Sequence, residues 1–503
     1  MGAANHSSSR RASTLLATLA TIVLFSGIVG IYLQTLIPKY RSAHQGASWR
    51  DALHAAEAGA NHAIHELNEF AASGNNTSSY RWADKGWGLL DAVFSLNGER
   101  ILGAALLPPL GGNNNQAVEK LSIDVYTREP VAPYHPWFRI RARGRASLPD
   151  RFVSADRRDG RLRRMKLGAT DNGKSAPYVS RTVEVIVKPR HRFVRAITTV
   201  ADMRLGYNDD WVVDSFDSSD PSRSQPGSAA GGVYPQDPAK RKSNGNIASA
   251  LTRPEGEPFG KLIHGNGAHV AGEVQTVGGD DPQTRDRENV SGTSGMDESR
   301  IRDDFDDDIP AAQVPQWKLA LPPPLGKTNF VAGAVGAPLR YVVPGNLGEF
   351  RVLPPVGGSK GAVEILVEGN LDVGALGSPR IIIPAGVTAA IFVKGDIRFG
   401  NATVNSGHES SRVASSLTVF GISESPLASY SASAGAEQTL AFYGPSYAVR
   451  MDGTVVTTGS MVAKSFQITN EGRGGFHYDE ALGRSGDVTG WTVVSYFEDV
   501  RGE

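Results

Sequence analysis

The sequence predicts a mainly β protein with a long N-terminal α-helix, a small antiparallel sheet and a C-terminal β-solenoid, that is, a parallel β-helix-like domain. Three observations lead to this fold class. Residues 12–37 form an uncharged apolar run, three segments between residues 119 and 187 alternate in part, and short apolar runs ending in Gly with Asn or Asp recur after residue 251. With 57 Gly and 29 Pro, the composition favours many short strands and turns over long globular helices.

The apolar run at residues 12–37 predicts a transmembrane helix, because it exceeds the roughly 20 residues needed to cross the hydrocarbon core. Arg10 and Arg11 precede it, so the positive-inside tendency places residues 1–11 in the cytoplasm and exports the remainder. A cleaved secretory signal is the alternative. Its apolar region is usually shorter, and Pro38-Lys39-Tyr40-Arg41 is a poor cleavage sequence.

The helix is expected to continue through Trp49–Leu67, where apolar residues recur at spacings of three and four. His62 and His65 lie three residues apart on it and would share one face. Because no third ligand is evident, we interpret them as ordinary surface histidines and expect no metal there.

Strands are expected in residues 119–126, 137–145 and 181–187, packed as an antiparallel sheet on the helix. The period of two places four arginines of the second strand on one face. They are Arg139, Arg141, Arg143 and Arg145. A solvated strand face and a strip that binds a polyanion are both compatible with this pattern. Nucleic acid is not an expected partner of a protein exported behind a membrane anchor.

Residues 201–250 are expected to form a polar linker rich in Ser, Asp, Pro and Gly. Asp214, Asp217 and Asp220 follow one another at a spacing of three, so calcium is an alternative for this segment, although the EF-hand pattern is missing. The acidic run at residues 303–308 is interpreted as a solvated loop.

Residues 251–489 carry the repeated short apolar runs, for example before Gly369-Asn370 and Gly395-Asp396. In a β-solenoid such runs are strands that bury alternate side chains against the next coil, and Gly and Asn adopt the left-handed backbone of tight corners. A β-sandwich of short strands is the alternative.

No catalytic constellation is evident, and the chain contains no Cys, which excludes disulfides, thiolate zinc sites and cysteine nucleophiles. We therefore expect no enzyme activity, no cofactor and no metal. The tightest titratable cluster in a motif is His477-Tyr478-Asp479-Glu480. It is interpreted as a polar cap over the last coil of the solenoid, with His477 or Asp479 as an acid or base in the enzymatic alternative.

Two parts of the chain resemble a known family. The order of Arg11-Ala-Ser-Thr-Leu-Leu, the apolar helix and Ala55-Ala56-Glu57-Ala58-Gly59 is similar to the N-terminal region of PilX-like type IV pilus assembly proteins, relatives of the minor pilins. The segment Gly459-Ser-Met-Val-Ala followed by His477-Tyr-Asp-Glu-Ala-Leu482, together with Val213–Ser218, resembles a β-helix-like domain of PilX-type envelope proteins.

The resemblance implies a pilin-like helix and sheet, a location in the bacterial inner membrane with the C-terminal domain in the periplasm or at the cell surface, and pilus components or other copies of the chain as partners. The expected organisation is a cytoplasmic tail at 1–11, a transmembrane helix at 12–37, a pilin-like amphipathic helix and sheet at 38–200, a polar linker at 201–250, a β-solenoid-like domain at 251–489 and a C-terminal tail at 490–503.

The leading functional hypothesis is a non-enzymatic envelope protein that contacts the bilayer through residues 12–37 and presents a β-solenoid for self-assembly, adhesion or pilus assembly. Surface polysaccharide is a candidate partner. A membrane-tethered polysaccharide-processing enzyme on a parallel β-helix is the alternative.

Overall fold

The structure is a computed structural model that describes residues 7–72, 87–88, 104–105, 116–125, 137–147, 178–205, 211–226, 232–251, 263–264, 268–277, 290–291, 297–307, 309–315, 317, 319–374, 380–485 and 488–499. The chain divides into two compact units. The helix–sheet unit contains residues 1–190 and 488–503, and the parallel-strand unit contains residues 191–487. The second unit is therefore inserted in the sequence of the first.

Helix α1 (Ser7–Ala72) is a single helix of 66 residues with Pro38 inside it. Side chains of residues 16–40 are exposed throughout, and this stretch belongs to the one described helix that is long and apolar enough to cross a membrane. From Ser48 onward one face becomes buried, and it consists mostly of alanines such as Ala52, Ala56 and Ala63. The helix predicted from residues 12–67 is confirmed.

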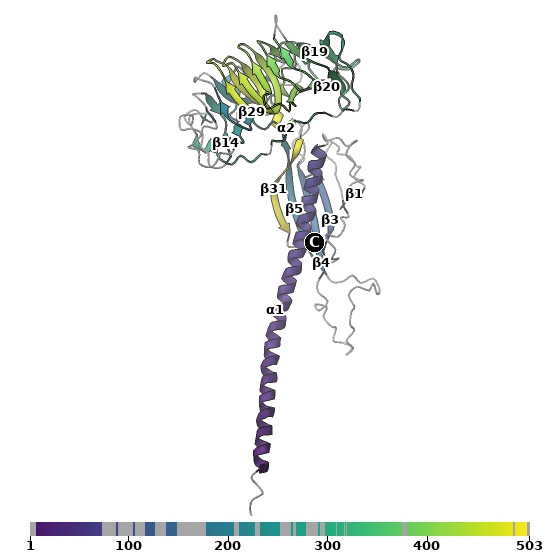
Figure 1. The fold of residues 1–503 in the computed structure, drawn as a ribbon, viewed down its shortest axis with the longest axis vertical. Helices are drawn as coiled ribbons and strands as arrows, with labels where there is room; N and C mark the ends of the chain where they lie inside the picture. The colour runs from purple at the N-terminus through teal and green to yellow at the C-terminus, as the bar shows by residue number, and fades with distance from the viewer. Residues whose placement is uncertain are drawn as a thin grey trace, which may run out of the picture. The chain divides into compact units, whose positions relative to one another are not determined.

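Four strands make the sheet of the helix–sheet unit in the order β3-β4-β5-β31 (Figure 1). Their bounds are β3 (Gln116–Val125), β4 (Phe138–Ser147), β5 (Tyr178–His191) and β31 (Val488–Asp499). β3 and β5 both pair antiparallel with β4. The predicted C-terminal tail at 490–503 is therefore wrong for most of its length, because β31 is an edge strand of this sheet. A separate antiparallel pair joins β1 (Trp87–Gly88) and β2 (Ala104–Ala105).

Helix α1 lies unusually close to the sheet at Gly144 of β4. A Cβ atom on Gly144 would lie 2.1 Å from the carbonyl oxygen of Ala52 and 2.4 Å from the backbone nitrogen of Ala56. The alternation along β4 sends Phe138, Ile140 and Ala142 into this core. Small residues on both partners thus let the helix backbone approach the strand backbone directly.

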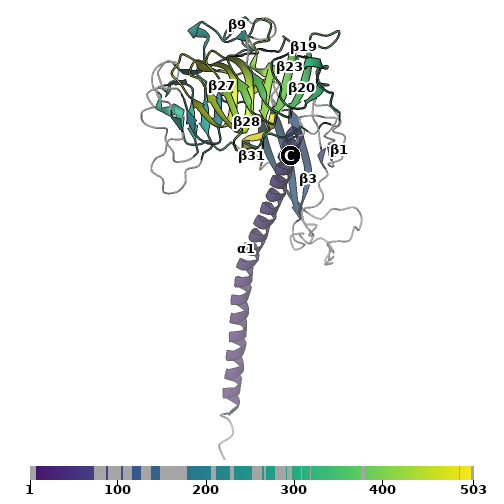
Figure 2. The ribbon, with the colours of Figure 1, turned by 45° about the horizontal axis from the view of Figure 1, so that its top comes forward.

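The parallel-strand unit contains a sheet of 23 strands (Figure 2). The strands are β6 (Ile197–Thr199), β7 (Met203–Arg204), β8 (Val212–Phe216), β11 (Ile247–Ser249), β12 (Ile263–His264), β13 (His269–Ala271), β14 (Val274–Thr276), β15 (Val290–Ser291), β16 (Ile301–Arg302), β17 (Asn329–Val331), β18 (Leu339–Val343), β19 (Phe350–Leu353), β20 (Gly361–Val367), β21 (Leu371–Val373), β22 (Arg380–Ile382), β23 (Val387–Val393), β24 (Ile397–Phe399), β25 (Thr403–Val404), β26 (Leu417–Gly421), β27 (Ser429–Ala432), β28 (Glu437–Met451), β29 (Val456–Ile468) and β30 (Gly475–Asp479). Smaller elements are β9 (Gln225–Pro226), β10 (Gly232–Val233), α2 (Leu482–Ser485) and the 3-10 helices η4 (Pro238–Lys240), η6 (Glu298–Arg300), η7 (Leu325–Lys327) and η8 (Ala414–Ser416).

The pairings of this sheet arrange its strands in three parallel rows. The first row runs β16-β14-β11-β6-β29-β28-β26-β23-β20-β18. The second runs β12-β7-β29-β28-β27-β24-β21, and the third runs β15-β13-β8-β30-β29-β28-β25-β22-β19-β17. The core lies between the rows, where buried apolar side chains such as Val363, Ile391 and Phe442 collect.

The chain enters this unit in the middle of the rows, because β6 pairs with β11 on one side and with β29 on the other. From β6 it proceeds outward to β16, and from β17 it returns rung by rung until β29 and β30 lie against β6 and β8. The predicted linker at residues 201–250 is therefore wrong, since it supplies β7, β8 and β11 to the sheet.

Asparagine and aspartate side chains stack at one corner of the rungs. The Oδ1 atom of Asn346 accepts a hydrogen bond of 2.9 Å from the backbone N–H of Asn370, and Oδ1 of Asn370 accepts one of 2.9 Å from the N–H of Asp396. Oδ1 of Asp396 then accepts from the N–H of Ser429 at 3.0 Å. The Gly-Asn and Gly-Asp pairs predicted to mark corners do so here. The predicted left-handed backbone is wrong at Gly369 and Gly395, and in this ladder it occurs at Gly345, with a φ of 80°. A further pair of this kind, Gly265-Asn266, lies outside the described residues.

The segment between β16 and β17, described at residues 303–307, 309–315, 317 and 319–328, crosses the outward side of the first row, and we call it the crossing segment. Within it, the carbonyl oxygen of Pro310 accepts a hydrogen bond from the Tyr443 hydroxyl, and the ring of Trp317 meets that of Phe392 edge-on at 5.9 Å. Leu321 then forms a β-bridge with Tyr341. The segment covers an outward column of aromatic rings, in which Phe392 and Phe420 stack at 4.8 Å.

Candidate functional site: the closing cluster

Two motifs singled out in the sequence lie side by side in the parallel-strand unit. β8 carries Asp214 and β30 carries His477, and the parallel register pairs these two residues directly. Because the two strands are paired in register, polar side chains of β8 come to lie beside polar side chains of β30. We call the polar side chains that join here the closing cluster: Asp214, Ser215, Asp217, Tyr234, Lys242, Asn244, His477, Asp479, Glu480 and Arg484.

His477, Asp214 and Tyr234 form one part of the cluster. The Nδ1 atom of His477 lies 2.6 Å from Oδ1 of Asp214, and the Tyr234 hydroxyl donates to Oδ2 of the same carboxylate at 2.6 Å. The Tyr234 ring stacks on the imidazole at a centroid distance of 3.6 Å. Burial and then the negative charge of Asp214 raise the pKa of Tyr234, so its hydroxyl stays a neutral donor.

Asp479 is completely buried and holds backbone groups in place. Its Oδ1 accepts hydrogen bonds of 3.1 Å from the N–H groups of Ser218 and Ala481, while its buried Oδ2 has no hydrogen-bond partner. Burial raises the pKa of Asp479 to about 6, against the lowering effect of the hydrogen bonds from Ser218 and Ala481. This carboxyl therefore titrates closer to neutral pH than an exposed aspartate.

Glu480 and Arg484 complete the cluster with charged contacts. Oε1 of Glu480 accepts from the Ser215 hydroxyl at 3.0 Å and from Nδ2 of Asn244 at 2.8 Å, and Oε2 pairs with the ammonium of Lys242. Arg484 pairs with Asp217. Burial raises the pKa of Asp217, but the hydrogen bonds from Ser219 and Arg484 outweigh it and leave that pKa lowered.

The contacts of the closing cluster connect distant chain segments and leave little of its side chains exposed to solvent. The imidazole of His477 is 12% exposed and the Asp214 carboxylate 5%, and each is bonded to another member of the cluster. The cluster ties β8, the segment after it and β30 together, so it joins the start of the unit to its end. The predicted cap over a last coil is wrong, because β30 has a paired strand on each side.

The carboxylates considered for calcium serve other partners. Asp214 bonds to His477 and Tyr234, Asp217 to Arg484, and Asp220 to the backbone and hydroxyl of Ser222. In the acidic run at 303–308, Asp304 pairs with Arg302 and Asp307 with Arg195. Among the described residues no group of three or more potential metal-ligating side chains converges.

Four members of the cluster were not predicted. Arg484 lies two residues beyond the His477–Leu482 motif. Tyr234, Lys242 and Asn244 lie in the polar segment that was interpreted as a linker, where no periodicity or motif marks them. Only the proximity of that segment to β8 gives them a role, and this follows from the fold.

The arginine face of β4 is also observed. Arg139, Arg141, Arg143 and Arg145 alternate with buried residues, as predicted. Arg141 pairs with Glu184 at 2.7 Å, and Arg143 donates to the Ser180 hydroxyl at 3.0 Å. Neighbouring strand β5 thus already engages part of this face.

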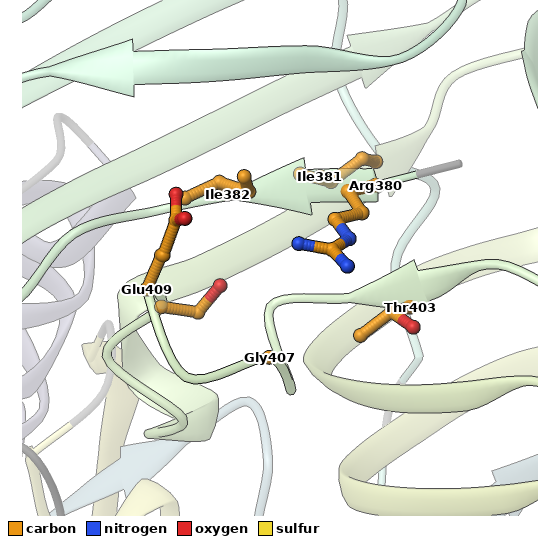
Figure 3. Close-up of a pocket in the computed structure, with 7 residues that line it drawn as sticks. Arg380, Ile381, Ile382, Thr403, Gly407 and Glu409 are labelled. Carbon is orange, nitrogen blue, oxygen red and sulfur yellow. The ribbon is translucent and has the colours of Figure 1, made fainter. Parts of the chain in front are cut away.

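A small hollow lies between β22, β25 and the loop that follows β25. Figure 3 shows Arg380, Thr403 and Glu409 around it. Its volume is about 10 Å³, which is the space of a single water molecule. Glu409 also pairs with Arg351, so the hollow is a polar gap between rungs with no room for a larger ligand.

Residues 356–485 match a family described as "Domain of unknown function (DUF7305)". The matched stretch ends with β30 and α2, and so includes His477 and Asp479. No curated protein matches the chain. Among solved structures, the chain is similar to the competence-associated pilin ComZ from Thermus thermophilus, with 11% sequence identity, coverage of 90% of this chain and 97% of that chain, and a TM-score of 0.26.

Proposed function

We propose that the protein is a non-enzymatic, pilin-like envelope protein of the PilX-like type, anchored in the bacterial inner membrane. The observation that carries the proposal is helix α1. Its residues 16–40 expose apolar side chains on every side, and the same helix then buries an alanine face against a four-stranded sheet. A soluble helix would hide such a surface, whereas a bilayer stabilises it.

The parallel-strand unit is the part that this anchor would present. Its three rows of parallel strands support a β-solenoid, in which each circuit of the chain contributes one strand to each row. With residues 1–11 in the cytoplasm, the sheet and the solenoid lie on the outer side of the membrane. There the solenoid would serve self-assembly, adhesion or contact with pilus components.

A structural role for the closing cluster supports the absence of catalysis. A general acid or base must reach the proton it transfers. Of the two candidates from the sequence, Asp479 is buried and His477 is mostly buried, and both are engaged in contacts that hold strands together. The polysaccharide-processing alternative therefore gains nothing from these two residues.

The test is to locate the full-length protein and determine its N-terminus. Cells expressing a copy tagged at the C-terminus are fractionated into cytoplasm, inner membrane, outer membrane and sheared surface fibres, and the protein is analysed by mass spectrometry. An intact N-terminus in the inner membrane supports a permanent tether. Recovery in sheared fibres would make it a fibre subunit, and recovery only as a soluble protein would contradict the anchor.

A further inference from the structure

A groove of about 240 Å³ crosses the outward side of the first row. Its floor is formed by side chains of three consecutive strands: Ala362 and Glu364 on β20, Thr388 and Ala390 on β23, and Thr418 on β26. The parallel register aligns Glu364 with Ala390 and Ala390 with Thr418. Because these residues come from three adjacent strands about 4.8 Å apart, the floor extends across the strands.

Larger side chains border this floor. Phe420 lies at one side, and Phe193 and Leu482, from near the start and the end of the unit's sequence, also line the groove. The crossing segment covers the neighbouring aromatic column through Trp317. The small residues of the floor therefore leave the groove open beside the aromatic column.

The polar groups of the groove are mostly hydroxyls. Thr388 and Ser415 are exposed and Thr418 is half-buried, so all three can donate and accept hydrogen bonds. The one carboxylate, Glu364, is paired with Arg340 at 2.8 Å. The lining thus combines apolar patches with neutral hydrogen-bonding groups.

An extended peptide does not suit this surface. The floor strands are paired on both sides, β20 with β18 and β23, and β23 with β20 and β26. Their backbone groups are occupied in the ladders, so a peptide could not add to the sheet as a further strand. A sugar chain has apolar C–H faces and hydroxyls around its rim, which matches a floor where Ala362 and Ala390 alternate with the hydroxyls of Thr388 and Thr418.

From these contacts we infer that the groove binds a polysaccharide chain laid across β20, β23 and β26. The site is distinct from the closing cluster and deepens the proposed function by naming a partner for the presented unit. It requires binding only, with no covalent step.

The test uses the full-length protein in a detergent without a sugar headgroup. Binding of cello-, chito- and galacturonate oligosaccharides is measured by isothermal titration calorimetry. At least one of them is expected to bind saturably. Ala390→Trp fills the groove and should weaken that binding about tenfold or more. Asp372→Trp, at an exposed position of β21 in the second row, is the matched control and should bind like the unsubstituted protein.

Thr388→Val keeps the shape of the side chain and removes one hydroxyl, so it tests the groove even if Ala390→Trp disturbs folding. It should weaken binding several-fold with an unchanged melting temperature. Absence of saturable binding to all three oligosaccharides, or unchanged affinity in both groove variants, overturns the inference. Cell fractionation tests the anchor independently, so the two proposals fail separately.

Discussion

The imidazole of His477 and the carboxylate of Asp214 are separated by 263 positions in the sequence and by 2.6 Å in the structure. One belongs to the last strand of the parallel-strand unit and the other to its third. This polar contact is one of several that join the two ends of a long insertion.

Replacing this histidine should loosen the insertion. His477→Ala leaves the buried Asp214 carboxylate with fewer partners, so we expect the free energy of unfolding to fall by about 1–3 kcal/mol. Urea denaturation followed by circular dichroism measures it, with exposed His408→Ala as the control. A double-mutant cycle with Asp214→Asn should give a coupling energy, and additive effects would show that the contact contributes nothing.

Asp479 predicts a pH dependence of stability. Because burial raises its pKa to about 6, above the 3.8 of an unperturbed aspartate, the folded state binds the proton more tightly than the unfolded state. This contribution is fully present below the unfolded pKa and is lost as the pH rises through about 6.

Asp479→Asn removes that titration and keeps an oxygen for Ser218 and Ala481. The variant should be more stable than the unsubstituted protein at about pH 8, by up to about 3 kcal/mol, and similar to it near pH 4. Melting temperatures across this range measure the difference, and exposed Asp372→Asn provides the control. If the melting temperatures of Asp479→Asn and the unsubstituted protein differ by the same amount at every pH, the predicted titration of Asp479 is wrong.

Gly144 should tolerate no side chain. Gly144→Ala directs a methyl group at the backbone of α1 near Ala52, so either the helix or β4 must move. We expect a loss of about 1–3 kcal/mol, measured by thermal unfolding and by proteolysis of the helix–sheet unit.

The matched control is Gly46→Ala in the same helix, where nothing lies within 4 Å of the new Cβ. Alanine is the better helix former, so this change should be neutral or stabilising by up to about 1 kcal/mol. Equal behaviour of the two variants would contradict the close packing of α1 on β4.

The corner ladder should depend on the side-chain oxygen of Asn370. Asn370→Ala removes the acceptor of the Asp396 N–H, and a cost of about 1 kcal/mol is expected. Asn370→Asp retains an acceptor and should retain most of the stability. Asn401→Ala, at an exposed position, serves as the control in the same urea titration.

The sequence predicted the elements with a local signal. Three predicted features depend on neighbouring residues alone. They are the alanine spacing of α1, the alternation of arginines in β4, and the pairs Gly369-Asn370 and Gly395-Asp396. β31 was missed because its partner β5 is distant in the sequence. Nothing in the residues of β31 themselves indicates which strand they pair with. Very short strands such as β7 and β12 have no period to detect.

The candidate site was predicted in part. Both motifs of the closing cluster, Val213–Ser218 and His477–Leu482, were singled out, but their contact requires the chain to begin in the middle of the rows. No pattern within either motif encodes that order. Tyr234 and Lys242 were missed for the same reason, since a polar segment is indistinguishable from a linker until its neighbours are known.

The place where the insertion begins and ends has a consequence for protein engineering. Within the parallel-strand unit, the Tyr478 hydroxyl donates to the carbonyl oxygen of Phe193, so a residue near its start meets one near its end. Within the helix–sheet unit, the Thr489 hydroxyl donates to the carbonyl oxygen of Arg190, so the two sides of the gap meet as well. Each unit thus closes on itself at the junction. The parallel-strand unit is therefore expected to be replaceable: a short turn between Arg190 and Val488 should still allow the helix–sheet unit to fold, and another domain could be inserted at the same position.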